Sequence, residues 1–182
     1  MVSRAERSPF ADWWWTVDRW LLASLGGLMV LGLVLTLAGS PPVAERLGLS
    51  TFHFVNRQVG YLIPAAMLMI ATSFLPPRLV RRAALLVFLG GMALVIAAIL
   101  FGVEVKGARR WIFGIQPSEF VKPAFVVLAA WAFSEGARRR DVPANIFALL
   151  LLPATIVPLI LQPDFGQTML VSLVWAALFF MA

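Results

Sequence analysis

The sequence contains no cysteine, so disulfide bonds and thiolate metal sites are excluded for this chain. It contains a single histidine, His53, and a lone histidine is a weak basis for a metal centre. Charged residues make up only 13% of the chain, whereas soluble domains carry about 25%. We predict no cofactor and no metal site, with a divalent cation left as an open alternative.

Apolar residues are abundant instead, at 61% of the chain. A soluble protein of 182 residues could not hide this much leucine, alanine, valine and phenylalanine from water. The apolar surface therefore has to face lipid. The composition predicts an all-α fold, a polytopic transmembrane helix bundle, and no nucleic-acid partner.

Six stretches of the chain carry no charge, and a membrane helix needs about 20 apolar residues. They are residues 20–44, 58–77, 83–103, 123–134, 142–163 and 165–182. The fourth stretch is too short alone, so we expect its helix to begin near Ser118 and to include Glu119 and Lys122. The last stretch runs to Ala182 without a polar flank. We therefore expect about six helices, with the chain ending within the sixth, and we expect the chain to be the N-terminal part of a longer protein.

Residues 1–19 have no signal-peptide pattern, since a polar lead with Arg4, Arg7 and Arg19 runs directly into a long apolar segment. We predict that residues 1–19 form a cytoplasmic segment and residues 20–182 a transmembrane domain. The tryptophans at positions 13, 14, 15 and 20 are typical of anchoring at the membrane interface. A docking surface for another protein is the alternative.

Lysine and arginine in the short loops predict orientation, because they concentrate on the cytoplasmic side. Nine of the 15 cations fall on the N-terminal side, in three clusters: Arg4, Arg7 and Arg19; Arg78, Arg81 and Arg82; and Arg138, Arg139 and Arg140. The other six are Arg46, Arg57, Lys106, Arg109, Arg110 and Lys122. The N-terminus is therefore predicted to be cytoplasmic. Four cations within residues 106–122 depart from the usual bias and need another explanation.

Residues 102–122 read GVEVKGARRWIFGIQPSEFVK, in which glycines interrupt helical structure and Pro117-Ser118 suits a helix start. Glu119 and Lys122 are three residues apart and can pair on one helix face. An interfacial loop with snorkelling cations and Trp111 at the headgroup level is one interpretation. The other is a binding site for an anionic headgroup such as a pyrophosphate-linked lipid, because arginine and lysine suit phosphate oxygens.

A second polar segment, QPDFGQT, covers residues 162–168. Asp164 is the only charge between Asp141 and the end of the chain. A carboxylate near membrane depth is costly and therefore points to function. An ordinary Pro-Asp-x-Gly turn explains the same residues equally well.

Three motifs in order, KGARRWI, IQPSEFVKPAF and LQPDFGQT, resemble signatures of the SEDS family, the membrane glycosyltransferases of shape, elongation, division and sporulation. The resemblance covers nearly the whole chain. The opening DWWWTVDRWLL and the loop SPPVAERLGLSTFHFVNRQ resemble the cell-division members more than the elongation members.

The resemblance implies a peptidoglycan glycosyltransferase of the inner membrane that polymerises lipid II at the division septum with a class B penicillin-binding transpeptidase. It implies substrate binding by Lys106, Arg109, Arg110, Glu119 and Lys122, with Glu119 orienting Lys122. Structural support is implied for Trp111, Gln116, Pro117, Ser118 and Asp164. The family has about ten helices, and its presumed general base lies in a later external loop, so no catalytic residue is expected in this chain. A lipid II flippase is the alternative, but it must present the headgroup to both sides.

Overall fold

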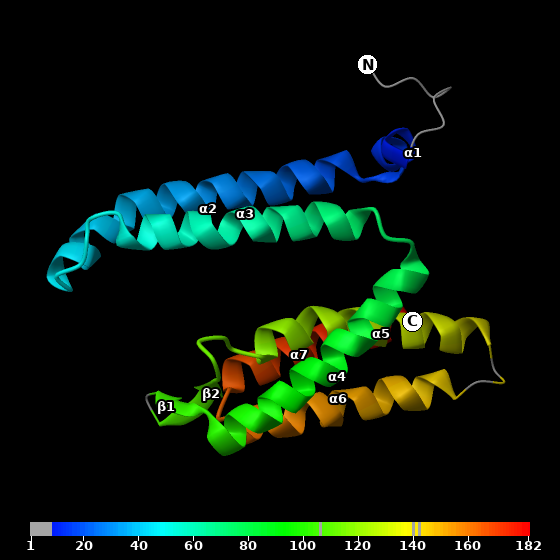
Figure 1. Cartoon of the computed structure of the whole chain (residues 1–182). Coiled ribbons are helices and arrows are strands. Elements are labelled where there is room, and N and C mark those ends of the chain that lie inside the picture. Colours follow the sequence, from blue (N-terminus) through cyan, green and yellow to red (C-terminus); the bar gives the residue numbers. More distant parts are fainter. Residues whose placement is uncertain (1–8, 106, 140, 142) are drawn as a thin grey trace. The chain divides into compact units, whose positions relative to one another are not determined.

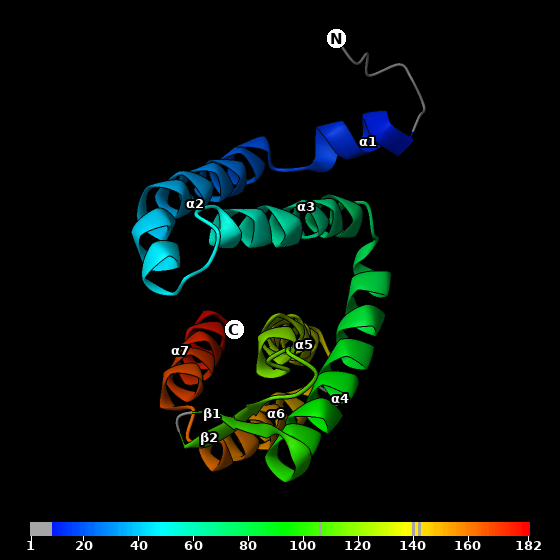
Figure 2. The ribbon, with the colours of Figure 1, turned by 60° about the vertical axis from the view of Figure 1, so that its left-hand side comes forward.

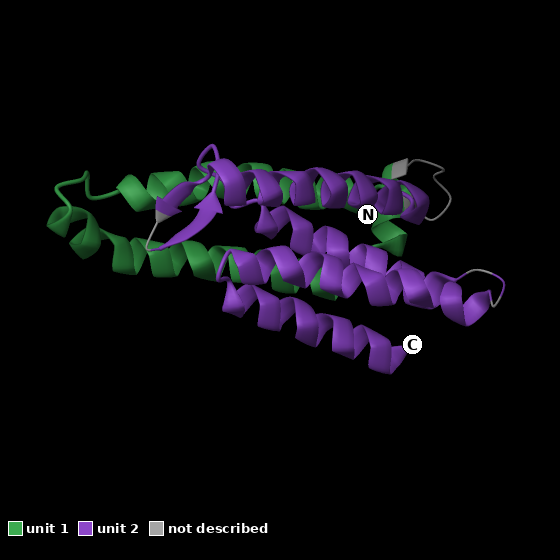
Figure 3. Ribbon diagram, turned by 90° about the horizontal axis from the view of Figure 1, so that it is seen from below, with its two compact units in different colours: residues 1–75 green, residues 76–182 purple. Residues whose placement is uncertain are grey.

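The computed structural model describes residues 9–105, 107–139, 141 and 143–182. The chain folds into two compact units, Met1–Leu75 and Pro76–Ala182, which are coloured separately in Figure 3. This boundary falls well after residue 19, where the sequence predicted the transmembrane domain to begin. That earlier boundary stays a prediction. Each unit is described separately.

Unit 1 contains a short helix α1 (Pro9–Thr16) and two long helices, α2 (Arg19–Arg46) and α3 (His53–Ser73). The long helices pack side by side and run in opposite directions (Figure 1). Asp18 caps the N-terminus of α2, because its carboxylate accepts hydrogen bonds from the backbone N–H groups of Trp20 and Leu21 at 2.9 and 3.0 Å. These bonds satisfy two of the free donors at a helix start.

Helix α2 continues through Pro41 and Pro42 to Arg46, so the connection to α3 is shorter than the predicted loop. The two prolines remove two intrahelical N–H donors, but their fixed φ angle suits the first turn of a helix. Both prolines nevertheless lie inside the continuous helix α2. The correction shortens the connection to residues 47–52.

The predicted tryptophan anchor adopts a defined structure at the start of unit 1. Trp13 donates a hydrogen bond from Nε1 to Oγ of Ser73 at 2.7 Å and stacks on Phe74 at 4.7 Å between ring centroids. The Arg19 guanidinium lies over the rings of Trp14 and Trp15, at 5.7 and 5.5 Å from their centroids. Trp13 therefore links α1 to the end of α3.

Unit 2 contains α4 (Pro77–Phe101), strands β1 (Val103–Val105) and β2 (Ala108–Trp111), α5 (Ser118–Arg138), α6 (Ala144–Leu161) and α7 (Phe165–Met181). Helix α5 packs against α4, α6 and α7, and Figure 2 looks nearly along it. Its apolar side chains form the core of the unit, with Phe125 and Leu128 buried against α4, α6 and α7 residues such as Val95, Leu159 and Val171.

Among the residues that the structure describes, five helices, α2 to α6, are long and apolar enough to cross a membrane, and α7 is a shorter apolar helix. The sequence placed six apolar helices at these positions. The all-α polytopic fold is therefore confirmed, and the chain is a multi-pass membrane protein. Helix α1 and the two strands were not predicted.

Close packing between α4 and α5 depends on Gly91. A methyl group there would lie 2.8 Å from Cγ2 of Val121, and a β-branched side chain cannot easily rotate away. The neighbouring Gly90 has nothing within 4 Å of the same position. Small residues of this kind let membrane helices approach closely.

We expect Gly91→Ala to lower the free energy of unfolding by about 1–3 kcal/mol, as overpacking does. Gly90→Ala is the matched control and should be neutral or slightly stabilising, because alanine favours a helix. Thermal unfolding of both variants in detergent measures the difference. Equal melting temperatures would show that the α4–α5 contact tolerates the extra methyl group.

Candidate functional site: the polar end of unit 2

A β-hairpin follows α4 and carries the first of the predicted site residues. Strands β1 and β2 are antiparallel, with Glu104 opposite Arg109. The turn includes Gly107 at φ 78°, a conformation that glycine adopts without strain. Lys106, which the sequence assigned to substrate binding, lies outside the described residues. The region predicted as a loop therefore contains a hairpin that presents Arg109.

Gly102 allows the hairpin to fold back on α4. A Cβ atom there would lie 2.2 Å from the carbonyl oxygen of Ala98 and 2.9 Å from that of Trp111. Both are backbone atoms, which cannot move aside as a flexible side chain can. The close approach fixes the strands relative to the end of α4, and so it fixes the position of Arg109 and Arg110.

Arg109 and Glu104 form an exposed ion pair across the hairpin, with Nε 3.7 Å from Oε2. About half of each side chain is exposed to solvent, so the pair contributes little to stability. A cavity of about 210 Å³ lies beside them, lined by Ile99, Glu104, Gly107, Ala108, Arg109, Leu161, Gln162 and Pro163. Arg109 therefore retains exposed donors at a small cavity.

Arg110 points the other way and holds the α6–α7 connection. Its Nε donates to the carbonyl oxygen of Gln162 at 3.1 Å, and its Nη2 donates to that of Pro163. Its Nη1 lies 3.6 Å from Oδ1 of Asp164. These contacts occupy most of the guanidinium, so Arg110 positions residues 162–164.

Asp164 is almost completely buried, and its partners are Arg110 and Gln116. Nε2 of Gln116 lies 3.2 Å from Oδ2 of Asp164 and 3.1 Å from Oγ of the buried Ser118. Burying a carboxylate without partners is costly, and removing one member of such a pair is strongly destabilising. The β2 strand, the residues before α5 and the start of α7 are therefore joined by polar contacts around Asp164.

Gln162 is a further buried member of this network that the sequence did not single out. Its Nε2 donates to the carbonyl oxygens of Val95, at 3.3 Å, and of Arg109, at 3.1 Å. It is only 2% exposed and links α4, β2 and the end of α6. The signal in the sequence was an amide at the end of a long apolar span, where an unpaired polar group is costly.

Glu119 and Lys122 form the predicted pair on α5, with Nζ of Lys122 against Oε2 of Glu119. Nε2 of Gln167 on α7 donates to the other carboxylate oxygen of Glu119 at 3.1 Å. Oε1 of Gln167 is buried without a hydrogen-bond partner among the described residues. Gln167 was also missed from the sequence, although it lies in the quoted motif.

The other residues predicted as structural support are Pro117, Ser118 and Trp111. The Pro117 carbonyl accepts hydrogen bonds from the N–H groups of Phe120 and Val121 at the start of α5. Ser118 is buried, and Trp111 is partly exposed while its carbonyl oxygen lies against Gly102. Except for Lys106, all predicted site residues thus lie at the hairpin end of unit 2.

The structure divides these residues into three groups: Arg109 with Glu104, Arg110 with Asp164, and Lys122 with Glu119. In the described part of unit 2, every carboxylate at this end has a cationic partner. Arg109 and Lys122 keep donors that can bind phosphate oxygens. The arrangement can bind an anion, and no described carboxylate stands free to take a proton.

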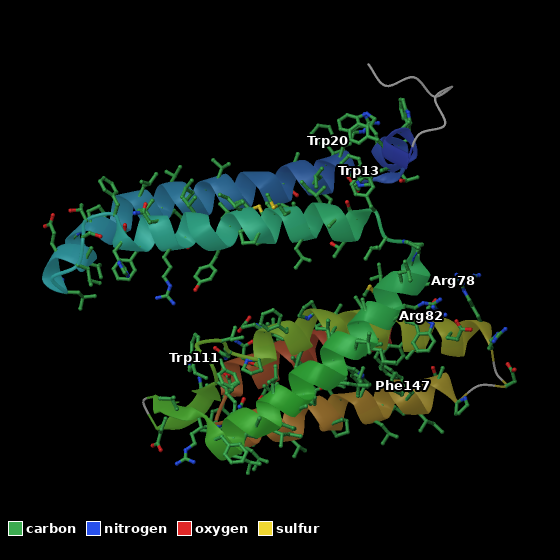
Figure 4. The ribbon with its side chains drawn as sticks, viewed as in Figure 1. Trp13, Trp20, Arg78, Arg82, Trp111 and Phe147 are labelled. Carbon is green, nitrogen blue, oxygen red and sulfur yellow. The ribbon has the colours of Figure 1, made fainter. Side chains whose placement is uncertain are left out.

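A second cavity of unit 2, about 570 Å³, lies at the opposite end of α4 and α5. It is lined by residues of α4, α5, the α5–α6 connection and the start of α6, including Arg78, Arg82 and Phe147 (Figure 4). None of the described residues predicted for substrate binding lines this cavity.

Comparison with known proteins identifies relatives of nearly the whole chain. A protein named probable peptidoglycan glycosyltransferase FtsW from Caulobacter vibrioides (strain NA1000 / CB15N) is 43% identical over 99% of this chain and 47% of its own length. Proteins of the same name from Idiomarina loihiensis and Escherichia coli O157:H7 are each 31% identical over 91% of this chain, and over 42% and 41% of their own lengths. No solved structure matches.

The chain spans about half the length of the curated relatives that it matches. The family model for the cell cycle proteins FtsW, RodA and SpoVE matches residues 19–182. Together with the three motifs, this confirms the resemblance seen in the sequence, including its division-type character. The chain belongs to the FtsW/RodA/SpoVE family of cell cycle proteins.

Proposed function

We propose that this chain is part of a peptidoglycan glycosyltransferase that polymerises lipid II during septal cell-wall synthesis. Its relatives carry the name peptidoglycan glycosyltransferase FtsW. The observation that carries the proposal is the gathering of phosphate-binding cations at one end of unit 2, with Arg109 exposed on the hairpin and Lys122 on α5. These groups suit the pyrophosphate of a lipid-linked donor.

In the proposed reaction, the growing glycan is transferred to the 4-hydroxyl of the acceptor sugar, and the bond to the pyrophosphate lipid breaks. Arg109 and Lys122 stabilise the negative charge that develops on the departing pyrophosphate. Glu119 and Gln167 hold Lys122 in place, and Arg110 shapes the site by fixing residues 162–164. Lys106, close to Arg109 in sequence, is assigned to the same anion by sequence alone.

The proton of the acceptor hydroxyl needs a general base. Glu104, Glu119 and Asp164 are each occupied by a cation, so none of them is assigned this role. We place the base in the part of the family's length that this chain does not span. A class B penicillin-binding transpeptidase is the proposed partner.

We further propose that the protein lies in the inner membrane at the septum, with a cytoplasmic N-terminus and the hairpin outside. Single cysteines test the orientation, because this chain has none. Phe113 and Ala137 are exposed at opposite ends of α5 and its flanking turns. Phe113 already has φ 51°, so it is a less disruptive position for a side chain than Gly107.

In a full-length protein with no other cysteine, an impermeant thiol reagent should label Phe113→Cys and Gly166→Cys in intact spheroplasts. Ala137→Cys should react only after the membrane is permeabilised. Labelling of Ala137→Cys with protection of Phe113→Cys would reverse the orientation.

A lipid II flippase is the second candidate. It needs anion-binding groups at both membrane faces, and the arginine-lined cavity at the opposite end provides a second cationic location. The described lining of that cavity has no serine, threonine, asparagine or glutamine side chain for the sugars of the headgroup, and the sequence places the unusual cations on one side only, so polymerisation is favoured. Polymerisation and lipid transfer are distinguishable with the same purified protein.

A further inference from the structure

The cavity at the non-hairpin end of unit 2 combines a charged mouth with an apolar interior. Its charged residues are Arg78, Arg81 and Arg82 of α4 and Glu135 of α5. The other lining residues are Leu85, Leu128, Trp131, Ala132, Pro143, Ala144 and Phe147. Its volume of about 570 Å³ lies within the range of about 300–1,000 Å³ that small-molecule sites occupy. Figure 4 shows Arg78 and Arg82 near the start of α4, with Phe147 across from them on α6.

The three arginines share one face of α4, because their spacing is i, i+3, i+4. They occupy its first turns, where the helix dipole already favours anions and no acidic residue is present. The side chains of Arg78 and Arg82 form no hydrogen bond or ion pair with any residue that the structure describes. Like charges at this spacing destabilise a helix unless an anion neutralises them.

The neighbours of the arginines leave the cluster positively charged. The Arg81 guanidinium lies over the Trp131 ring, 5.3 Å from its centroid, so its direction is fixed along the cavity wall. Glu135 has a partner of its own, since its Oε1 lies 3.6 Å from Nε of Arg139. One carboxylate shared with Arg139 cannot neutralise three guanidinium groups.

The interior of the cavity selects an apolar tail and not a sugar. Leu85, Leu128 and Phe147 provide aliphatic and aromatic surface within the candidate membrane spans. No serine, threonine, asparagine or glutamine is among the lining residues described, so sugar hydroxyls would find no amide or hydroxyl partner. Arginine forks match phosphate oxygens in two-point contacts.

We propose that this cavity is a specific site for an anionic glycerophospholipid. Its phosphate binds Arg78, Arg81 and Arg82, and one acyl chain lies along Leu85, Leu128 and Phe147. The site is separate from the hairpin end and does not depend on the glycosyltransferase proposal. Basic pockets between membrane helices bind anionic lipid headgroups in this way.

The test measures lipid binding to the delipidated full-length protein in detergent. Dioleoyl phosphatidylglycerol should bind at least ten times more tightly than dioleoyl phosphatidylcholine, which has the same chains. It should also raise the melting temperature, because a ligand that binds the folded state stabilises it. Farnesyl pyrophosphate and glycerol phosphate are the competing probes, and both should displace phosphatidylglycerol poorly.

Two matched variant pairs separate the headgroup from the chain. Arg78→Gln/Arg82→Gln should weaken phosphatidylglycerol binding at least tenfold and abolish the lipid-induced rise in melting temperature. Arg19→Gln/Arg138→Gln removes the same charge outside the cavity and should change binding less than twofold. Leu85→Trp should block the chain and reduce binding, whereas Leu86→Trp, at a more exposed neighbour that does not line the cavity, should not.

Four results would overturn the proposal. Equal affinity for the two phospholipids would remove the role of charge, and tighter binding of farnesyl pyrophosphate would assign the cavity to an isoprenoid. Unchanged binding in Arg78→Gln/Arg82→Gln would place the lipid elsewhere. The fourth result combines two observations: the wild type binds no lipid, and Leu85→Trp unfolds the protein. Together they would show that another part of the full-length protein fills the cavity.

Discussion

Replacing Lys122 by alanine in the full-length protein should reduce glycan polymerisation at least tenfold while the protein still inserts into the membrane. Only a fifth of the Lys122 side chain is exposed, and its described charge partner is Glu119. Removing a charged partner from a desolvated pyrophosphate site costs about 2–5 kcal/mol, which corresponds to at least a tenfold loss. The measurement is the yield of glycan from labelled lipid II by purified protein with its partner transpeptidase.

Arg138→Ala is the control for Lys122→Ala. Arg138 lies in the last turn of the same helix and is exposed, so its loss should leave activity almost unchanged. Normal glycan synthesis by the purified Lys122→Ala protein would remove Lys122 from the mechanism.

Arg110→Ala should also abolish polymerisation. It removes a positive charge and also the contacts that hold residues 162–164 in place. It removes hydrogen bonds to the carbonyl oxygens of Gln162 and Pro163 and leaves Asp164 with Gln116 as its remaining described side-chain partner. We therefore expect a lower melting temperature for Arg110→Ala and not for Arg138→Ala. Lys122→Ala is the cleaner test of substrate binding because its pair is partly exposed.

Residues 1–182 alone should have no polymerase activity. The chain spans about half the length of its curated relatives, and the described carboxylates at the hairpin end are all paired with cations. No group among them is placed to take the acceptor's proton, so the loss should be complete. Partly exposed polar groups such as Glu119 and Lys122 are also costly when they face lipid, which favours poor folding or dimerisation.

The measurement is to purify residues 1–182 in detergent, add labelled lipid II and the partner transpeptidase, and look for glycan ladders. The full-length protein under the same conditions is the positive control. Ladders from the fragment that survive inactivation of the partner would place the chemistry in these residues and show that the base is among them.

The helices could be predicted because hydrophobic length is a strong local signal. Uncharged stretches at 20–44 and 83–103 became α2 (Arg19–Arg46) and α4 (Pro77–Phe101), and the expected start near Ser118 is where α5 begins. Lipid demands a continuous apolar surface and internally satisfied backbone, so sequence and structure agree closely there. The same reasoning missed the extension of α2 through Pro41-Pro42, since proline pairs usually end helices.

The candidate site was predicted in composition but not in its internal contacts. From the sequence, Arg109, Arg110 and Lys122 were predicted to bind substrate as equivalent cations. In the structure, Arg110 instead donates hydrogen bonds to the carbonyl groups of the α6–α7 connection. That contact joins positions 52 and 53 residues apart, which no local pattern encodes. The position of the hairpin depends on the close backbone contact at Gly102, and the role of Gln162 depends on its burial between α4 and β2. Neither contact is visible in the sequence alone.

The most direct test is the fate of lipid II with the purified full-length protein and a partner transpeptidase in liposomes. Glycan polymerisation predicts ladders, with one pyrophosphate lipid released for each disaccharide added, and loss of both products in Lys122→Ala. Transfer of intact lipid II across the bilayer, with no ladder and no released pyrophosphate lipid, would contradict polymerisation and identify a transporter.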